Sequence, residues 1–260
     1  MSNTLTAPIR QYMSRPVFSV GPTTLLSDVY QELRSAKVSS LAVVEADALV
    51  GVISRTDLLR AGTRNSEQGS ENLEFASTEV GEIMTRDVSL VGPETEVAAA
   101  SQLMCEGHFH RVFVGTNTEL KGVFSTLDVM LAIGEGEAPE PISDFMSTPV
   151  EVVDVEATLA SALRMLEERG ITGLIAVEND WPVGVFTQRD ALAARNLADD
   201  TPVEEAMDPA LICMPVTTKM RRAAQQALRM RVRRIVASES RHMRGVLSGL
   251  DFARYAASAR

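Results

Sequence analysis

The chain has 260 residues, 45% of them hydrophobic, with 25 Lys and Arg against 35 Asp and Glu. This length suits one large domain or two ordinary ones, and the apolar content is enough to bury cores without disulfides. No run of about 18 apolar residues is present to cross a membrane, and the first residues lack the apolar stretch of a signal peptide. A cytoplasmic protein is therefore expected.

The cysteines and histidines exclude most catalytic chemistry. Cys105 and Cys213 lie among apolar neighbours, without the spacing of a metal site, and are expected to be reduced core residues. The three histidines, His108, His110 and His242, are too few and badly placed for a metal site or a triad with a nucleophile. We expect no catalytic residues, no metal and no required cofactor, and thus no enzyme.

The charge is unevenly distributed. Residues 219–260 contain eleven basic residues and two acidic ones, a net charge of +9, whereas residues 1–218 contain 14 basic and 33 acidic, a net charge of −19. Such asymmetry can mark an anionic ligand or a nucleic-acid surface, although an acidic protein can also dock a basic end against itself.

The predicted elements recur in one order. Residues 17–20 read as a strand, 25–36 as an amphipathic helix, and 41–44 and 50–53 as two strands that lead into a helix beginning near Asp57. This β-α-β-β-α order defines four repeats, at about 9–62, 80–134, 142–197 and 203–257.

The connectors divide the chain. Residues 1–8 are predicted as a loose arm, and residues 62–78, rich in Gly, Ser, Asn and Glu, as a mobile loop. Residues 134–141 combine turn formers with like charge in the middle of the chain. We predict a boundary there, between a domain at 1–134 and a domain at 141–260.

A seven-residue motif occurs four times, as glycine, two apolar residues, a hydroxyl residue and an aspartate three places later. The copies begin at Gly51, Gly122, Gly184 and Gly245, and a methionine (Met13, Met84, Met146, Met207) stands 44 residues before each motif aspartate. This fixed spacing identifies a four-fold internal repeat.

The motif predicts a strand, a tight junction and a helix start. The helix N-terminus presents unpaired N–H groups and a positive dipole end, so a phosphate could bind there beside the hydroxyl. The aspartate could accept hydrogen bonds from a ribose diol. Alternatively, Ser or Thr followed three residues later by an acidic residue forms a capping box, which stabilises the helix without any ligand. The motif alone favours the cap.

Four such units, three of them opening with Met followed by Ser or Thr, resemble the cystathionine-β-synthase (CBS) domain family. The resemblance covers nearly the whole chain and implies an α/β (α+β) fold in which repeats pair into two Bateman modules with packed sheets and flanking helices. It implies clefts for adenosyl ligands such as AMP, ADP, ATP or S-adenosylmethionine. By resemblance, ribose and phosphate contacts fall to the motif residues Ser54, Asp57, Ser125, Asp128, Thr187, Asp190, Ser248 and Asp251.

The repeats differ just before each central strand. The pairs 17 and 18 residues before the motif aspartates are His110-Arg111 and Arg233-Arg234 in repeats two and four, but Ser39-Ser40 and Thr172-Gly173 in repeats one and three. Nucleotide-binding members of the family often have a basic residue at this step. The guanidinium of arginine can donate two hydrogen bonds to a phosphate. The alternative is that these cations form surface ion pairs. Weaker candidates are Arg55 and Arg189 in the motif loops and Lys37, His108 and Arg231 near helix ends.

We therefore expect a sensor of an adenosyl nucleotide that signals to a separate, unknown effector protein and assembles as a homodimer or disc. The rival interpretation is an interaction or nucleic-acid-binding protein that uses the basic C-terminal repeat and keeps vestigial clefts. No recognition helix or aromatic stacking pattern accompanies the arginines of that repeat, namely Arg221, Arg222, Arg229, Arg231, Arg233 and Arg234.

Overall fold

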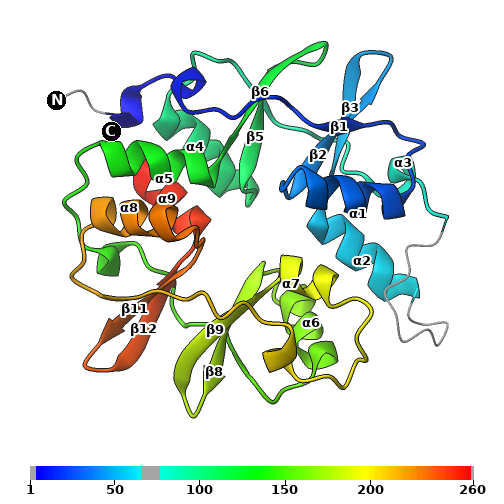
Figure 1. The fold of residues 1–260 in the computed structure, drawn as a ribbon. Helices are drawn as coiled ribbons and strands as arrows, with labels where there is room; N and C mark the ends of the chain where they lie inside the picture. The colour runs from blue at the N-terminus through cyan, green and yellow to red at the C-terminus, as the bar shows by residue number, and fades with distance from the viewer. Residues whose placement is uncertain (1–3, 66–76, 259–260) are drawn as a thin grey trace. The chain divides into compact units, whose positions relative to one another are not determined.

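The computed structural model describes residues 4–65 and 77–258 (Figure 1). Repeat one contains β1 (Ser19–Val20), α1 (Leu26–Ser35), β2 (Ser40–Glu45), β3 (Ala48–Ser54) and α2 (Arg55–Asn65). Repeat two contains α3 (Val80–Ile83), β4 (Leu90–Val91), α4 (Val97–Gly107), β5 (Arg111–Thr116), β6 (Glu119–Ser125) and α5 (Thr126–Glu135). Repeat three contains β7 (Val152–Asp154), α6 (Leu159–Glu168), β8 (Gly173–Glu178), β9 (Trp181–Thr187) and α7 (Gln188–Ala193). Repeat four contains β10 (Cys213–Pro215), α8 (Met220–Met230), β11 (Ile235–Glu239), β12 (His242–Leu247) and α9 (Gly249–Ser258).

Each repeat forms its own three-stranded sheet, and the predicted α/β (α+β) class and β-α-β-β-α order are confirmed. The first strand pairs parallel to the second, because a helix carries the chain back across the sheet. The third strand returns antiparallel through a short hairpin. In the first hairpin the two turn residues, Ala46 and Asp47, have φ of +46° and +62°, the left-handed pair that a tight hairpin requires.

The first helix of each repeat buries the face that its apolar spacing predicts. In α1 the buried residues are Leu26, Val29, Tyr30 and Leu33, the same four that the helical periodicity selects. One or two residues after this helix, the chain turns left-handed in every repeat. Its φ is +55° at Lys37, +52° at His108, +61° at Gly170 and +57° at Arg231. These weaker site candidates therefore end helices.

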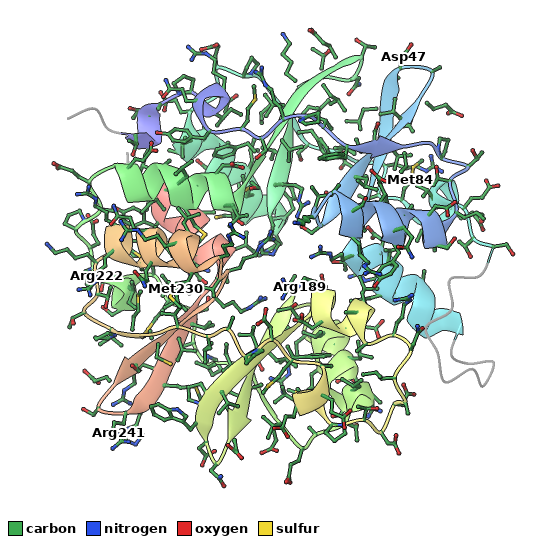
Figure 2. All side chains as sticks on the ribbon, viewed as in Figure 1. Asp47, Met84, Arg189, Arg222, Met230 and Arg241 are labelled. Atoms are coloured by element: carbon green, nitrogen blue, oxygen red, sulfur yellow. The ribbon has the colours of Figure 1, made fainter. Side chains whose placement is uncertain are left out.

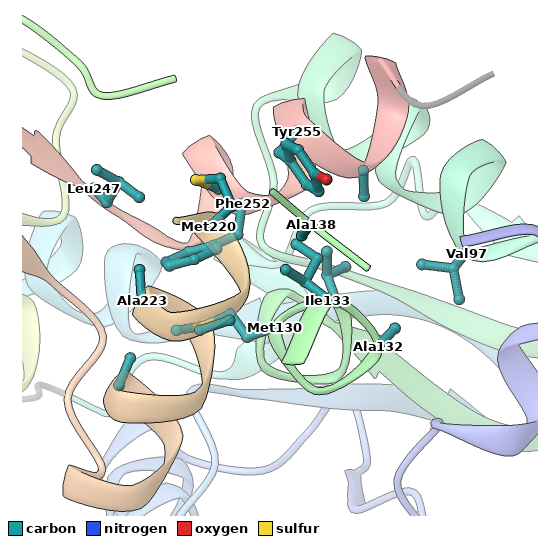
Figure 3. Close-up of a cluster of buried hydrophobic side chains, with 14 of the residues drawn as sticks. Val97, Met130, Ala132, Ile133, Ala138, Met220, Ala223, Leu247, Phe252 and Tyr255 are labelled. Atoms are coloured by element: carbon teal, nitrogen blue, oxygen red, sulfur yellow. The ribbon is translucent and has the colours of Figure 1, made fainter. Parts of the chain in front are cut away.

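The contacts divide the chain into two units, each built from alternate repeats. Unit 1 comprises Met1–Val17, Ser89–Val150 and Leu211–Arg260, and unit 2 comprises Phe18–Val88 and Glu151–Ala210. In unit 1, α5 packs against α8 and α9, and α4 packs against α9. Figure 3 shows part of this core, with Met130 of α5, Met220 of α8 and Phe252 of α9. In unit 2, α2 packs against α7. The predicted boundary at residues 134–141 stays a prediction about how the chain would fold when cut.

The opening segment of each repeat lies on the sheet of its neighbour in sequence. We call residues 9–15, 80–86, 142–148 and 203–209 the exchanged segments. Their isolated bridges join Ser14 to Val123, Thr85 to Val52, Ser147 to Val246 and Asp208 to Val185. Repeat one thus contributes its segment to repeat two and receives the segment of repeat two, and repeats three and four do the same.

The exchange explains the motif glycines. A Cβ built on Gly51 would lie 2.6 Å from Sδ of Met84 and 3.0 Å from the carbonyl oxygen of Thr85. The corresponding Sδ distances are 2.8 Å for Gly122 and Met13, 2.8 Å for Gly184 and Met207, and 2.6 Å for Gly245 and Met146. Only glycine leaves room for the segment that crosses it.

Two sequence predictions need correction. Residues 4–8 are no loose arm, because Leu5 is 3% exposed and the Thr4 hydroxyl donates to the Ala132 carbonyl at 2.8 Å. Cys213 is exposed and Cys105 is half-buried, so neither is a fully buried core residue. A strand alternates its faces, and Cys213 falls on the outer face of β10.

The loop predicted at 62–78 begins later than expected, because α2 extends to Asn65, and residues 66–76 lie outside the described residues. Within the described part of the chain, no helix has the length and apolarity to cross a membrane.

Candidate functional site

The four motifs share one local geometry. The hydroxyl residue ends the hairpin and the aspartate lies in the first helical turn, where the backbone N–H and the hydroxyl of the first residue both donate to Oδ2 of the second. The N–H and hydroxyl distances are 2.8 and 2.7 Å for Ser54 and Asp57, 2.7 and 2.7 Å for Ser125 and Asp128, 2.9 and 2.5 Å for Thr187 and Asp190, and 2.6 and 2.7 Å for Ser248 and Asp251. The capping role is therefore present in every repeat, and any ligand role depends on the other oxygen, Oδ1.

The surroundings of the aspartates differ between repeats. Asp251 is completely buried. Its Oδ1 accepts from the Ser147 hydroxyl at 2.7 Å and lies 3.1 Å from Nη1 of Arg254. Burial raises the pKa of Asp128, against the opposing hydrogen bonds from Ser125 and Ser14. In both repeats the second donor is a serine of an exchanged segment, so the motif aspartate ties that segment to the sheet.

Asp57 and Asp190 are the two motif aspartates of unit 2. Oδ1 of Asp190 accepts from Nε of Arg189 at 3.3 Å, and Asp190 is 7% exposed. Asp57 is only partly buried, and within residues 4–65 and 77–258 the bonds to its carboxylate are those from Ser54 to Oδ2. The four sequence-equivalent aspartates are thus not equivalent in their hydrogen bonding.

The predicted cations lie beside the motif hydroxyls of unit 1. Arg111 begins β5 and pairs in register with Ser125, the motif hydroxyl residue of repeat two. Arg234 precedes β11, whose first residue pairs with Leu247, so Arg234 lies level with Ser248. Repeats one and three place Ser40 and Gly173 at this step, and those residues belong to unit 2.

The three arginines act electrostatically on His110. The pKa of His110 is lowered to about 4 by its burial and by the charges of Arg111, Arg234 and Arg233. Since Arg233 and Arg234 come from repeat four and His110 and Arg111 from repeat two, the packing of alternate repeats brings the four groups close enough to interact. We call these four residues the cationic cluster.

The neutral state of His110 predicts a pH dependence of stability. Its pKa is about 4 in the folded chain and about 6.5 when unfolded, so the unfolded chain takes the proton first. The stability that the neutral ring contributes is present above pH 6.5 and is lost as pH falls from 6.5 toward 4. Between pH 7 and pH 5 the wild-type chain is expected to lose roughly 2 kcal/mol more of its free energy of unfolding than His110→Gln.

Urea unfolding at the two pH values measures this difference. His242→Gln is the matched control, because it removes an exposed histidine of the same unit. Parallel pH profiles for the wild type and His110→Gln would contradict a buried, neutral His110.

The net charge also follows the units. Unit 1 holds 15 basic and 11 acidic residues, a net charge of +4, and unit 2 holds 10 basic and 24 acidic residues, a net charge of −14. The basic C-terminal repeat is therefore packed with repeat two, which holds more acidic than basic residues, in a unit that is positive as a whole.

The two motif-loop arginines have partners in unit 2. Nη2 of Arg55 donates to the Val38 carbonyl at 2.8 Å, and Nη2 of Arg189 donates to Oδ2 of Asp208 at 2.5 Å. The role of Arg189 was beyond sequence reasoning, because Asp208 reaches it only through segment exchange. The one available signal was that Met207 alone is followed by an acidic residue.

Known proteins share this architecture. A family model described as the CBS domain matches residues 9–64, 80–135 and 142–196. The fourth repeat lies outside these ranges but has the same order of elements. The solved structure of protein MJ1225 from Methanocaldococcus jannaschii superposes with a TM-score of 0.82 at 18% identity, covering 95% of this chain and 99% of that chain. At this identity the likeness shows the fold.

Curated relatives match over shorter segments. The CBS domain-containing protein CBSX3, mitochondrial, of Arabidopsis thaliana is 34% identical over 111 residues, 41% of this chain and 51% of that protein. Protein MJ1404 of M. jannaschii is 28% identical over 187 residues, 65% of this chain and 42% of that protein. The chain thus spans about half the length of these relatives. Because the family model matches more than half of the residues and all four repeats share one fold, the chain belongs to the CBS domain family.

Proposed function

We propose that this chain is a non-catalytic regulator that binds an adenine nucleotide or another adenosyl ligand and signals its occupancy to a separate effector protein. AMP, ADP, ATP and S-adenosylmethionine are the candidate ligands. The observation that carries the proposal is the cationic cluster of unit 1, which places Arg111 and Arg234 level with the motif hydroxyls Ser125 and Ser248.

The cluster supplies what a phosphate needs. Two N-terminal helix ends, those of α5 and α9, meet in unit 1, where a Cβ on Gly249 would lie 2.5 Å from the Thr126 hydroxyl oxygen. Helix N-termini favour anions, but the buried aspartates of both motifs repel them. Arg111 and Arg234 offset that repulsion, and a guanidinium can donate two hydrogen bonds to one phosphate. His110 is neutral, so it can donate from one ring nitrogen without adding charge.

The test is the ratio of AMP affinity to adenosine affinity, measured by calorimetry at fixed salt. Truncating either arginine, in Arg111→Ala or Arg234→Ala, is expected to weaken AMP by about 1.5 to 3 kcal/mol, the range for hydrogen bonds to charged groups, and to change adenosine little. The salt concentration is held constant because added ions screen the same contact.

Ser40→Ala and Gly173→Ala are the matched controls, because they change the equivalent positions of unit 2 without removing a charge. Their AMP-to-adenosine ratio should equal that of the wild type. An unaltered ratio in both arginine variants would remove phosphate recognition from the cluster and leave the two arginines as surface ion pairs.

A second candidate function is nucleic-acid or acidic-protein binding. It is favoured by the exposed arginines of unit 1 on and just after α8, namely Arg221, Arg222, Arg229, Arg231 and Arg233. Phosphate-backbone binding weakens steeply as salt rises. A gel shift that is lost between low and physiological salt, and that is unaffected by AMP, would favour this function over nucleotide sensing.

A further inference from the structure

The residue after the methionine of each exchanged segment faces the motif of the neighbouring repeat. It is Ser14, Thr85 and Ser147 in three segments but Asp208 in the fourth. The backbone N–H and carbonyl of Asp208 both bond to Val185 of β9, at 2.9 Å each, which fixes this residue beside the third motif. Two carboxylates, those of Asp208 and Asp190, therefore lie at one motif.

Arg189 lies between the two carboxylates. Its Nη2 donates to Oδ2 of Asp208 at 2.5 Å and its Nε to Oδ1 of Asp190 at 3.3 Å, and Figure 2 shows it at the start of α7. Burial lowers the pKa of Arg189, but the two carboxylates outweigh that effect and raise the pKa above its usual value. The guanidinium is thus held charged in this position.

The arginine and the aspartate occur together in one repeat only. The position of Arg189 is Thr56, Leu127 and Leu250 in the other three motifs, and the residue after the methionine of the segment that each of these repeats receives is Ser or Thr, not an acid. A second carboxylate beside a buried aspartate requires a compensating charge. Repeat three has both the second carboxylate, Asp208, and the arginine that compensates its charge, Arg189.

The pairing occupies every carboxylate oxygen at the third motif. Oδ2 of Asp190 accepts from the N–H and hydroxyl of Thr187, and Oδ1 accepts from Arg189. In Asp208, Oδ2 accepts from Arg189 and Oδ1 from the N–H of Ala210 at 2.9 Å. A ribose hydroxyl approaching Asp190 would have to share Oδ1 with a charged donor, which weakens its binding. Asp57, in the same unit, has its carboxylate bonded only to Ser54 among the described residues and is less buried.

Building on the nucleotide-binding function proposed above, we propose that Arg189 and Asp208 close the motif of repeat three to ribose and that Asp57 is the ribose-accepting carboxylate of unit 2. Two positions then decide which repeat of this unit is ligand-competent. Thr56 and Thr85 leave repeat one open, whereas Arg189 and Asp208 close repeat three.

Calorimetric titration with AMP and with 2′-deoxy-AMP tests the assignment. Asp57→Asn is expected to remove the ribose preference from one binding event per chain, a loss of roughly 10-fold, which corresponds to ~1.4 kcal/mol. Asp190→Asn should leave the titration unchanged. The reverse pattern, with a loss in Asp190→Asn and none in Asp57→Asn, would overturn the proposal.

A double variant tests the closure directly. Arg189→Thr combined with Asp208→Thr gives repeat three the residues of repeat one, Thr56 and Thr85, at both positions, so it should bind one more AMP per chain than the wild type. Asp190→Asn added to this background should remove the extra site. Arg164→Leu, which deletes an exposed arginine of α6 in the same unit, is the control and should keep the wild-type stoichiometry.

The outcomes separate this inference from the function on which it rests. A wild-type chain that binds none of AMP, ADP, ATP or S-adenosylmethionine refutes the proposed function, and the inference with it. A wild-type chain that binds AMP, together with a double variant that folds with the wild-type melting behaviour but gains no site, refutes only the closure by Arg189 and Asp208.

Discussion

Replacing Asp251 by alanine is expected to lower the free energy of unfolding by roughly 3 kcal/mol or more, the cost of breaking a buried charged network. The Asp251 carboxylate is completely buried and accepts from the N–H and hydroxyl of Ser248 and from the Ser147 hydroxyl, and it pairs with Arg254. Its removal leaves the half-buried donors of Ser248 and Ser147 without their acceptor. The exchanged segment that carries Ser147 also loses its side-chain attachment to repeat four.

Asp57→Ala is the matched control, because Asp57 is partly exposed and, among the residues that the structure describes, its carboxylate accepts from Ser54 alone. Loss of a helix cap of this kind costs about 1 kcal/mol. Urea unfolding of both variants gives the comparison. Equal losses at the two positions would show that Asp251 acts as a cap alone and that its bond to Ser147 contributes nothing.

Replacing Gly122 by valine is expected to cost about 3 kcal/mol, the upper end of the range for overpacking a buried site. A Cβ at this position would already lie 2.8 Å from Sδ of Met13 and 3.0 Å from the Ser14 carbonyl oxygen. Valine adds two methyl groups to that contact. The smaller Gly122→Ala serves if the valine variant unfolds, and its loss should be smaller in proportion.

A double-mutant cycle identifies the methionine involved. Met13→Ala should relieve part of the cost of the Gly122 substitution, with a coupling of roughly 0.5 to 3 kcal/mol between the two positions. Met84→Ala should show no coupling to Gly122, because Met84 contacts Gly51. Coupling of Gly122 to Met84, the methionine that stands 44 residues before Asp128, would mean that the segments are not exchanged.

The features that depend on neighbouring residues were predictable from the sequence. The buried face of α1 follows from apolar residues spaced at a helical period, and the order of elements follows from four copies of one local pattern. The cap between Ser125 and Asp128 could also be predicted, since it joins residues three apart.

The exchange could not be predicted, and the reason is the repeat itself. Every methionine stands at the same distance from its own motif, so the spacing cannot tell whether Met13 meets Gly51 or Gly122. The packing of alternate repeats is equally hidden. The sequence shows cations at Arg111 and Arg234 but not that their repeats share a unit, which the lowered pKa of His110 reflects.

Segment exchange also limits how such a chain can be inherited. A single repeat copied alone would carry an opening segment with no neighbouring sheet to cross. Its own sheet would lack a segment at the motif glycine, where Gly51, for example, packs against Met84. Two neighbouring repeats copied together bring both segments and both sheets, and each sheet receives its segment at once. The smallest stretch that can be duplicated or deleted without leaving an unfilled sheet within the chain is therefore a pair of neighbouring repeats.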